Sequence, residues 1–269
     1  MQVEKVELDE LLTRADFITL HVPLTDGTRN TLPGQARILG DARSFRADVS
    51  AAIAAGASMV GLVFFKKSPR NVDLQLAAQL GDLVRIEANN ACKIVALTVN
   101  PTNEELEAIC GTISPDIVQL HGSESPDRVF EIRQQFGIPV MKAIGVSQAG
   151  DFGQLVAYRN SADRLLIDAK PPKDSPLPGG NGLTFNWDIL DALTQDSSGG
   201  LPVMLSGGLN IENVTEAVRL SAAHSIISGI DVSSGVETSP GVKDKDLIET
   251  FLRLAKAAHT SQSQKGFAA

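Results

Sequence analysis

Short apolar runs and amphipathic stretches alternate along most of the chain. The apolar runs predict strands at Ala36–Gly40, Ser58–Phe64, Lys93–Val99, Ile117–His121, Pro139–Ile144, Arg164–Asp168, Pro202–Ser206 and Ser228–Val232. Helical spacing of apolar residues predicts helices at Phe45–Ala55, Val72–Ile86, Asn103–Thr112, Pro126–Phe136, Gly150–Arg159, Asp188–Leu193, Ile211–Leu220 and Lys245–Ala258. Strands this apolar are typical of a parallel sheet covered by helices on both faces. The alternation therefore predicts an α/β fold, the closed (β/α)8 or TIM barrel, rather than an open doubly wound sheet.

The first 33 residues do not follow this rhythm. They contain one helical pattern, Val6–Arg14, and one strand pattern, Phe17–Val22, ended by Pro23. The stretch from Leu8 to Asn30 resembles an internal piece of the 2-hydroxyacid dehydrogenases, phosphoglycerate dehydrogenase in particular. No G-x-G-x-x-G motif precedes it, so it cannot build a dinucleotide site. We expect an N-terminal arm over residues 1–33 that lies outside the barrel, a barrel over 34–258, and a disordered tail over 259–269.

Composition narrows the possible partners. The chain has 269 residues, a net charge of −8 and a pI near 5.0, which argues against a nucleic-acid partner. Its start lacks the apolar segment of a signal peptide, and no apolar run approaches the length of about 20 residues that a membrane span needs. Cys92 and Cys110 have no metal-type spacing. We expect a cytoplasmic monomer or homodimer that binds a small molecule without a metal.

Two glycine- and serine-rich loops follow the last two predicted strands. The first contains Gly207 and Gly208, and the second runs from Asp231 through Ser233, Ser234 and Gly235. Such loops leave backbone N–H groups and hydroxyls available to an anion, as in the phosphate site after strands 7 and 8 of a TIM barrel. The alternative is two ordinary glycine turns. We expect a phosphorylated small-molecule ligand here.

Further polar residues stand at or near the carboxyl ends of predicted strands, where active sites of this fold lie. They are Arg70, Gln119, His121, Lys142, Asp168 and, in the long loop after the sixth strand, Gly180. Arg70 could bind a carboxylate through a bidentate fork. His121 could position a substrate or cap its loop. Lys142 could extend a positively charged floor or pair with Asp168.

From about Gly56 to Ala258 the chain resembles the phosphoribosylanthranilate isomerases. The shared motifs are G-L-V-F-F-K-K-S-P-R, V-A-L-T-V-N-P-T, Q-L-H-G-S-E-S-P, L-I-D-A-K, P-G-G-N-G-L-T-F-N-W, L-S-G-G-L-N-I-E-N-V and D-V-S-S-G-V-E-T-S-P-G-V-K-D. The resemblance implies an Amadori rearrangement of an aminoaldose phosphate in tryptophan biosynthesis, without a cofactor. It also implies that Asp168 is the general acid that opens the ribose ring; the alternative is a barrel-rim aspartate that pairs with Lys170. Arg70 suits the anthranilate carboxylate, and its alternative is an ordinary surface arginine.

The first predicted strand departs from that family, whose general base is a cysteine in a K-I-C-G strand end. Motif shape places Leu39 at the cysteine position, whereas counting back from Gly56 without gaps places Asp41 there. Leucine cannot accept a proton, but the Asp41 carboxylate could act as the base. The sequence therefore predicts either an isomerase with Asp168 as acid and Asp41 as base, or an inactive phosphosugar-binding barrel derived from it. A related enzyme such as indole-glycerol-phosphate synthase is disfavoured, because its lysine-rich motifs are not apparent.

Overall fold

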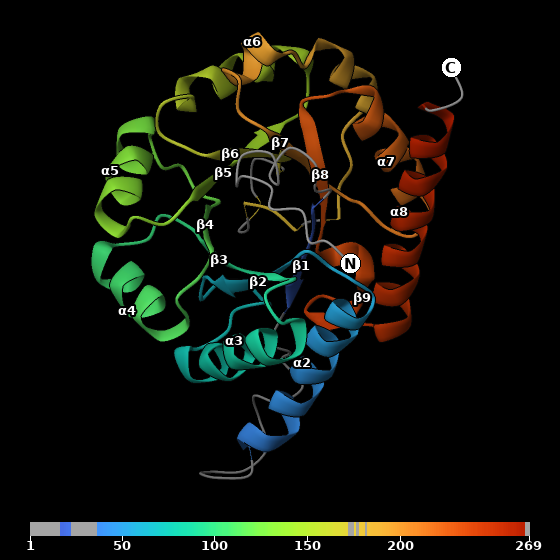
Figure 1. Cartoon of the computed structure of the whole chain (residues 1–269). Coiled ribbons are helices and arrows are strands. Elements are labelled where there is room, and N and C mark those ends of the chain that lie inside the picture. Colours follow the sequence, from blue (N-terminus) through green and yellow to red (C-terminus); the bar gives the residue numbers. More distant parts are fainter. Residues whose placement is uncertain (1–16, 23–36, 172–174, 176–177, 181, 267–269) are drawn as a thin grey trace, which may run out of the picture.

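A computed structural model of the protein describes residues 17–22, 37–171, 175, 178–180 and 182–266, with only the backbone of 17–22, 37–44 and 260–266 (Figure 1). Eight parallel strands close into a barrel in chain order. They are β1 (Phe17–Val22), β2 (Met59–Phe64), β3 (Lys93–Thr98), β4 (Ile117–Leu120), β5 (Val140–Val146), β6 (Arg164–Ala169), β7 (Val203–Leu205) and β8 (Ile227–Val232). The predicted fold class is therefore confirmed.

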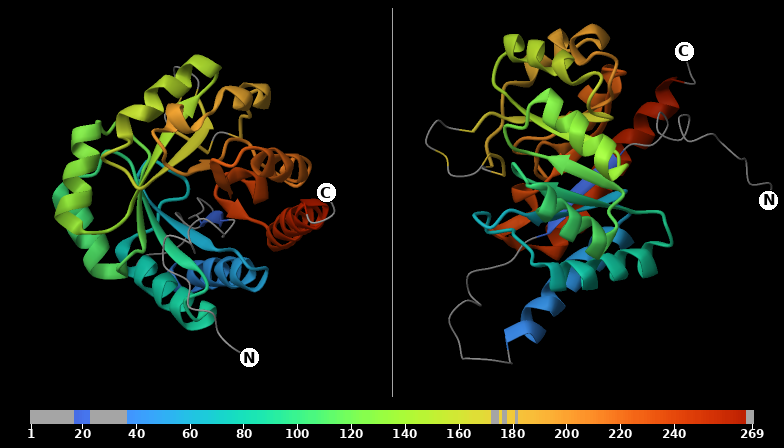
Figure 2. Two further views of the ribbon diagram at one scale, coloured as in Figure 1. Left: turned by 45° about the horizontal axis from the view of Figure 1, so that its top comes forward. Right: turned by 90° about the vertical axis from the view of Figure 1, so that its left-hand side faces the viewer.

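Helices surround the strands in a ring, which the two views of Figure 2 show from different sides. The α-helices are α2 (Arg37–Ala54), α3 (Leu74–Ala88), α4 (Asn103–Ile113), α5 (Pro126–Phe136), α6 (Gln195–Ser198), α7 (Val214–Ala223) and α8 (Lys245–Gly266). The 3₁₀ helices are η2 (Ala149–Tyr158), η3 (Trp187–Ala192) and η4 (Ser234–Val236). A short hairpin of β9 (Glu237–Ser239) and β10 (Val242–Lys243) follows β8.

The first strand of the barrel is not the one that the sequence pattern predicts. Phe17–Val22 pairs in parallel with β2 and with β8, and it closes the barrel. The expectation that residues 1–33 lie outside the barrel is therefore wrong for this segment. The run F-I-T-L-H-V is rich in aromatic and β-branched residues, which suit a strand. The remaining residues of the expected arm lie outside those that the structure describes.

The predicted strand Ala36–Gly40 is also wrong, because the chain from Arg37 to Ala54 is the helix α2. Good helix formers such as arginine, leucine and alanine recur through this stretch, and its later turns bury Phe45, Val49 and Ala52. At the other end of the chain, α8 continues to Gly266, so the disordered tail predicted from residue 259 is wrong up to that point. A helix anchored by a buried face propagates beyond it at low cost.

Two apolar layers hold these elements together. Inside the barrel lies a small cluster of buried side chains, comprising Met59, Val95, Ile117, Met141, Ala143, Leu166 and Met204. A much larger cluster fills the space between the strands and the helices, with α3 contributing Ala77, Leu80 and Val84. Because apolar groups fill the barrel, any pocket has to form at its rim, where the loops that follow the strands meet.

Candidate functional site

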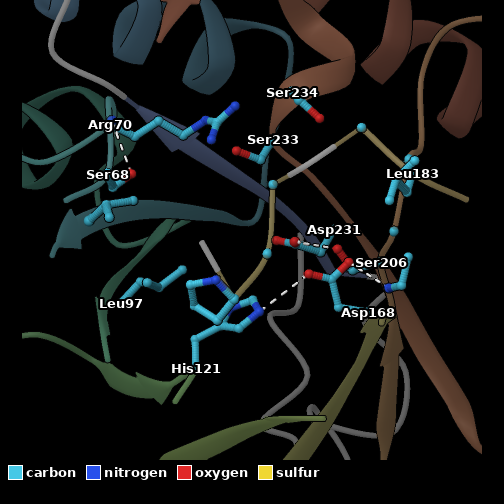
Figure 3. A pocket seen from close by; sticks show the side chains of 18 of the residues that line it. Ser68, Arg70, Leu97, His121, Asp168, Leu183, Ser206, Asp231, Ser233 and Ser234 are labelled. Atoms are coloured by element: carbon cyan, nitrogen blue, oxygen red, sulfur yellow. Dashed lines mark hydrogen bonds and ion pairs between the residues drawn. The ribbon is translucent and has the colours of Figure 1, made fainter. Parts of the chain in front are cut away.

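A pocket opens at the carboxyl ends of the strands, and it encloses about 740 Å³ together with its open mouth. Most of the predicted site residues line it, namely Arg70, His121, Asp168, Gly180, Gly207, Gly208, Asp231, Ser233 and Ser234. Figure 3 shows the side chains of the non-glycine residues of this set around the pocket, namely Arg70, His121, Asp168, Asp231, Ser233 and Ser234. The structure thus brings together residues as far apart in the chain as Arg70 and Ser234.

The two glycine loops have backbones that require glycine. Gly207 and Gly208 have φ angles of +93° and +63°. A Cβ at Gly207 would lie 2.7 Å from the backbone nitrogen of Ala169, and one at Gly208 would lie 2.7 Å from the carbonyl oxygen of Leu183. Gly235 does not line the pocket; a Cβ there would collide with the carbonyl oxygen of Leu209. Gly235 therefore lets the two loops pack together, whereas Gly207 and Gly208 form the pocket wall. Such loops suit an anion.

Asp168 stands opposite His121 at the end of β6. Its Oδ1 accepts a hydrogen bond from the backbone N–H of Ala169 (2.8 Å), and its Oδ2 lies 3.3 Å from His121 Nε2. The other ring nitrogen of His121, Nδ1, lies 3.1 Å from Nε2 of the fully buried Gln119. With the amide donating to Nδ1, a neutral ring carries its proton on Nε2 and directs it to Asp168. Gln119 therefore orients His121 from below and does not line the pocket.

Arg70 is held by a partner that the sequence analysis did not identify. Its Nε and Nη2 donate to the two carboxylate oxygens of Glu237, over 2.8 and 2.7 Å. The edge expected to grip a substrate carboxylate is thus occupied. Nη1 lies on the side of Gly180, where an added Cβ would be 2.7 Å from it. Burial favours a higher pKa for Glu237, but hydrogen bonds from Arg70 and the charges of Lys243 and Arg70 outweigh it and lower that pKa.

Lys142 does not line the pocket and does not pair with Asp168. Its Nζ donates to Glu124 (2.8 Å) and to the carbonyl oxygens of Leu120 and Gly122 (3.2 and 2.7 Å). Burial lowers the pKa of Lys142, and Glu124 partly opposes that shift. Because these carbonyls flank His121, the buried ion pair supports the loop that presents His121 rather than a ligand.

The structure does not place the two candidates for the missing base at a strand end. Leu39 and Asp41 both lie in α2. Cys92 is buried just before β3, and burial together with Asp116 raises the pKa of its thiol to about 12. Cys110 lies in α4, where burial also raises its pKa. Among the described side chains, the only carboxylates that line the pocket are Asp168 and Asp231, and Asp231 accepts a hydrogen bond from Ser206 (2.9 Å).

The described part of the chain contains neither a metal-binding cluster nor a helix that could span a membrane. No group of three or more histidine, cysteine, aspartate or glutamate side chains there is arranged to hold a metal ion. Within the same residues, no helix is long and apolar enough to cross a membrane. The pocket itself is lined by an anion cradle, a carboxyl–imidazole pair and an arginine.

Comparisons with known proteins point to one family. The family profile described as N-(5′-phosphoribosyl)anthranilate isomerase matches residues 41–253. The chain is 52% identical over 215 residues to an isomerase of that name from Rhodopseudomonas palustris (strain BisB18), covering 80% of this chain and 93% of the relative. It is 46% identical to the one from Rhizobium meliloti (strain 1021), covering 78% and 92%.

Solved structures of the same isomerase have a similar fold. The crystal structure of phosphoribosyl anthranilate isomerase from Thermotoga maritima has a TM-score of 0.65 at 27% identity, covering 90% of this chain and all of that one. A structure in complex with reduced 1-(o-carboxyphenylamino)-1-deoxyribulose 5-phosphate has a TM-score of 0.63, with the same identity and coverage. The family match in sequence begins at Asp41, after β1, whereas the match to the Thermotoga maritima structure covers 90% of this chain.

Proposed function

We propose the function of this site from one premise, which is that the chain belongs to the N-(5′-phosphoribosyl)anthranilate isomerase family. Its members are intramolecular oxidoreductases of the aldose–ketose type. The proposed reaction is the Amadori rearrangement of N-(5′-phosphoribosyl)anthranilate to 1-(o-carboxyphenylamino)-1-deoxyribulose 5-phosphate in tryptophan biosynthesis. The observation that carries this proposal is the convergence of Asp168 and His121 beside the loops of Gly207, Gly208 and Ser233 in one pocket.

The proposed mechanism needs an acid and then a base. The Asp168 carboxyl protonates the ring oxygen of the ribose, so that the C1–O bond breaks and an imine forms. A base then removes the proton from C2 to give an enolamine, which tautomerises to the ketone. His121 keeps the Asp168 carboxyl pointed at the ring oxygen. The phosphate occupies the cradle of Gly207, Gly208, Ser233 and Ser234, and Arg70 Nη1 meets the anthranilate carboxylate.

The second step, removal of the C2 proton, lacks the cysteine base of the family. The strand β1 has the sequence F-I-T-L-H-V, without a cysteine, and Asp41 lies in α2. A well-placed general base contributes about 10²–10⁴-fold in rate. We propose that the chain binds its substrate normally and turns it over more slowly by about this factor. We also propose that the protein is a cytoplasmic monomer or homodimer. The phosphoribosylanthranilate isomerase of Thermotoga maritima is dimeric.

The same observation favours a second candidate function. If no group replaces the cysteine at all, the chain is a barrel that binds the phosphosugar without isomerising it. The binding residues after β6, β7 and β8 serve both candidates equally. The two differ only in whether catalysis above the uncatalysed rate survives.

The test compares the wild type with Asp168→Asn. The variant keeps the shape of the side chain and removes its proton, so kcat should fall about 10²–10⁴-fold while KM changes little. Product formation is followed chromatographically, and Asp127→Asn, on the exposed first turn of α5, is the matched control. Equal kcat in wild type and Asp168→Asn would remove Asp168 as the acid. Binding of the reduced product analogue without turnover would favour the second candidate, and no binding would refute both.

A further inference from the structure

Glu237 is the centre of a buried charged cluster beside the pocket. Its Oε1 accepts from Arg70 Nε and from Lys243 Nζ, both at 2.8 Å. Its Oε2 accepts from Arg70 Nη2 (2.7 Å) and from the backbone N–H of Gly241 (3.1 Å). The side chain is only 3% exposed. Four donors therefore fix this carboxylate in one orientation.

Lys243 extends the cluster to the phosphate loop. It is the cross-strand partner of Glu237 in the β9–β10 hairpin, and its side chain is fully buried. Besides Glu237, its Nζ donates to the carbonyl oxygen of Ser233 over 2.7 Å. Because a trans peptide is planar, holding this carbonyl also holds the N–H of Ser234 in the opposite direction.

We propose that Glu237 and Lys243 are positioning residues that tie Arg70, in the loop after β2, to the phosphate loop after β8. The strand β1 lies between these two loops in the barrel, because it pairs with both β2 and β8. Figure 3 shows the Arg70 side chain pointing toward the side of the pocket where Ser233 and Ser234 lie. The brace of Glu237 and Lys243 thus spans the strand whose sequence differs from the family. This inference rests on the proposed function.

The brace prepares Arg70 for a ligand carboxylate. A free arginine side chain has many rotamers, and ordering it on binding costs affinity. With Nε and Nη2 already bonded to Glu237, the direction of Nη1 is set before the ligand arrives. The ammonium of Lys243 balances the charge of Glu237, so the arginine keeps a net positive field for the anthranilate carboxylate. Buried charges contribute little net stability, so a role in positioning accounts for the cluster better than stability does.

The test is a double-mutant cycle in which one change removes the Glu237 carboxylate from the protein and the other removes the carboxylate from the ligand. Two probes are titrated by calorimetry, namely the reduced product analogue and its phenylamino counterpart, which lacks the carboxylate. For the wild type, loss of the carboxylate should weaken binding about 10–100-fold, as expected for a charge-assisted hydrogen bond. For Glu237→Gln the same change should weaken binding less than about threefold, because Arg70 is no longer aimed. Glu249→Gln removes an exposed pairing with Lys245 (3.5 Å) and should behave as wild type.

Glu237→Gln could fail to fold, so a second variant and a pH series on the wild type test the same proposal independently. Lys243→Met should show the same loss of discrimination. Burial lowers the pKa of Lys243 to about 8, while Glu237 opposes the shift. The charged groups that interact electrostatically with Lys243 are Glu237, Arg70, Asp231 and Asp48. Between pH 7 and 9 the wild type should lose roughly tenfold in affinity for the carboxylate probe as Lys243 deprotonates, and Lys243→Met should not.

The outcomes separate this inference from the function on which it rests. If the wild type binds neither probe, the proposed function fails and the brace fails with it. If the wild type discriminates between the probes, and Glu237→Gln and Lys243→Met discriminate equally well, the proposed function stands and the brace is refuted. If the wild type shows no change in affinity between pH 7 and 9, the part assigned to the Lys243 ammonium is refuted.

Discussion

Strands β8 and β1 lie side by side in the barrel, yet they differ in what they bring to the pocket. β8 carries Asp231 into the lining and leads directly into Ser233 and Ser234. β1 makes regular parallel pairs with both neighbours, but its sequence has no cysteine, and the family match begins only at Asp41. Backbone pairing accepts many sequences, because every residue except proline offers the same N–H and C=O. Catalysis requires one side chain at one position, so closure of a barrel does not secure its chemistry.

Restoring a thiol to β1 should produce the largest effect. Cysteine is introduced in turn at Thr19, Leu20, His21 and Val22, since a scan over consecutive positions covers both faces of a strand. One variant should raise kcat by about 10²-fold or more, within the range that a general base contributes. Steady-state turnover is the measurement. Asp41→Asn is the control and should be silent, because Asp41 lies in α2.

Two results would break the contrast between the two strands. If none of the four cysteine variants gains activity, the missing thiol is not what limits turnover. If Asp41→Asn reduces kcat, then α2 supplies the base despite its position outside the ring of strands.

Substitutions in the loops after β7 and β8 should change the affinity for the ligand rather than the rate of the chemical step. At Gly208, with φ of +63°, a Cβ would lie 2.5 Å from Thr184 Cγ2 and 2.7 Å from the Leu183 carbonyl oxygen. Gly208→Ala should weaken binding of the reduced product analogue about 10–100-fold, because backbone strain of this kind costs about 1–3 kcal/mol. Calorimetry measures the affinity. Gly150→Ala, where a Cβ would meet nothing within 4 Å, is the matched control. Equal affinities would mean that the cradle tolerates a different backbone.

The smallest effect is expected at Asp48, and it is an effect on stability. Asp48 lies in α2, which follows β1, and it interacts electrostatically with Lys243 and Asp244, which follow β8. Burial raises its pKa to about 6, with Lys243 opposing and Asp244 adding to the shift. The folded state therefore binds the proton more tightly than the unfolded state. Its contribution to stability is fully present below pH 3.8 and is lost as the pH rises through about 6.

Asp48→Asn should remove this dependence. Above pH 7 it should raise the free energy of unfolding by roughly 1–3 kcal/mol, since each pKa unit corresponds to about 1.4 kcal/mol. Urea unfolding at pH 5 and pH 8 measures the difference, with Asp246→Asn on the exposed first turn of α8 as control. A difference between wild type and Asp48→Asn that does not change with pH would contradict the assignment.

Sequence patterns were sufficient for the last seven strands and insufficient for the first. The apolar runs from Met59 onward are bounded by turns, so their periodicity and their length both predict strands. Arg37-Ile38-Leu39-Gly40 is a short apolar run, and periodicity cannot separate such a run in a strand from the same run in a helix. The sequence pattern predicts a strand at Phe17–Val22, but this strand stands apart from the regular alternation of strands and helices, which favours an arm. Only pairing with β2 and β8 shows that it belongs to the barrel.

The site divides in a similar way. Gly207, Gly208, Ser233 and Asp168 follow strands directly, so the parallel fold alone brings them to one rim. Glu237 and Lys243 lie in a hairpin whose strands are too short for the sequence pattern to predict, although Pro240-Gly241 between them is a turn signal. The sequence predicts the strand of Lys142 correctly. It does not predict that Lys142 is buried, because the partners of its ammonium are Glu124 and the Gly122 carbonyl in the loop after β4.

The pairing of β1 with β8 also has a consequence for the order of folding. Every other neighbouring pair of strands in the barrel is consecutive in the chain, whereas this pair joins segments from near its two ends. Long-range pairing of this kind is slow, since the entropy of a large loop must be lost before the contact forms. We therefore expect a half-closed intermediate in which β2 and β8 present open edges to other chains. The rate at which Phe17–Val22 docks would then determine how long the nascent protein stays prone to aggregation.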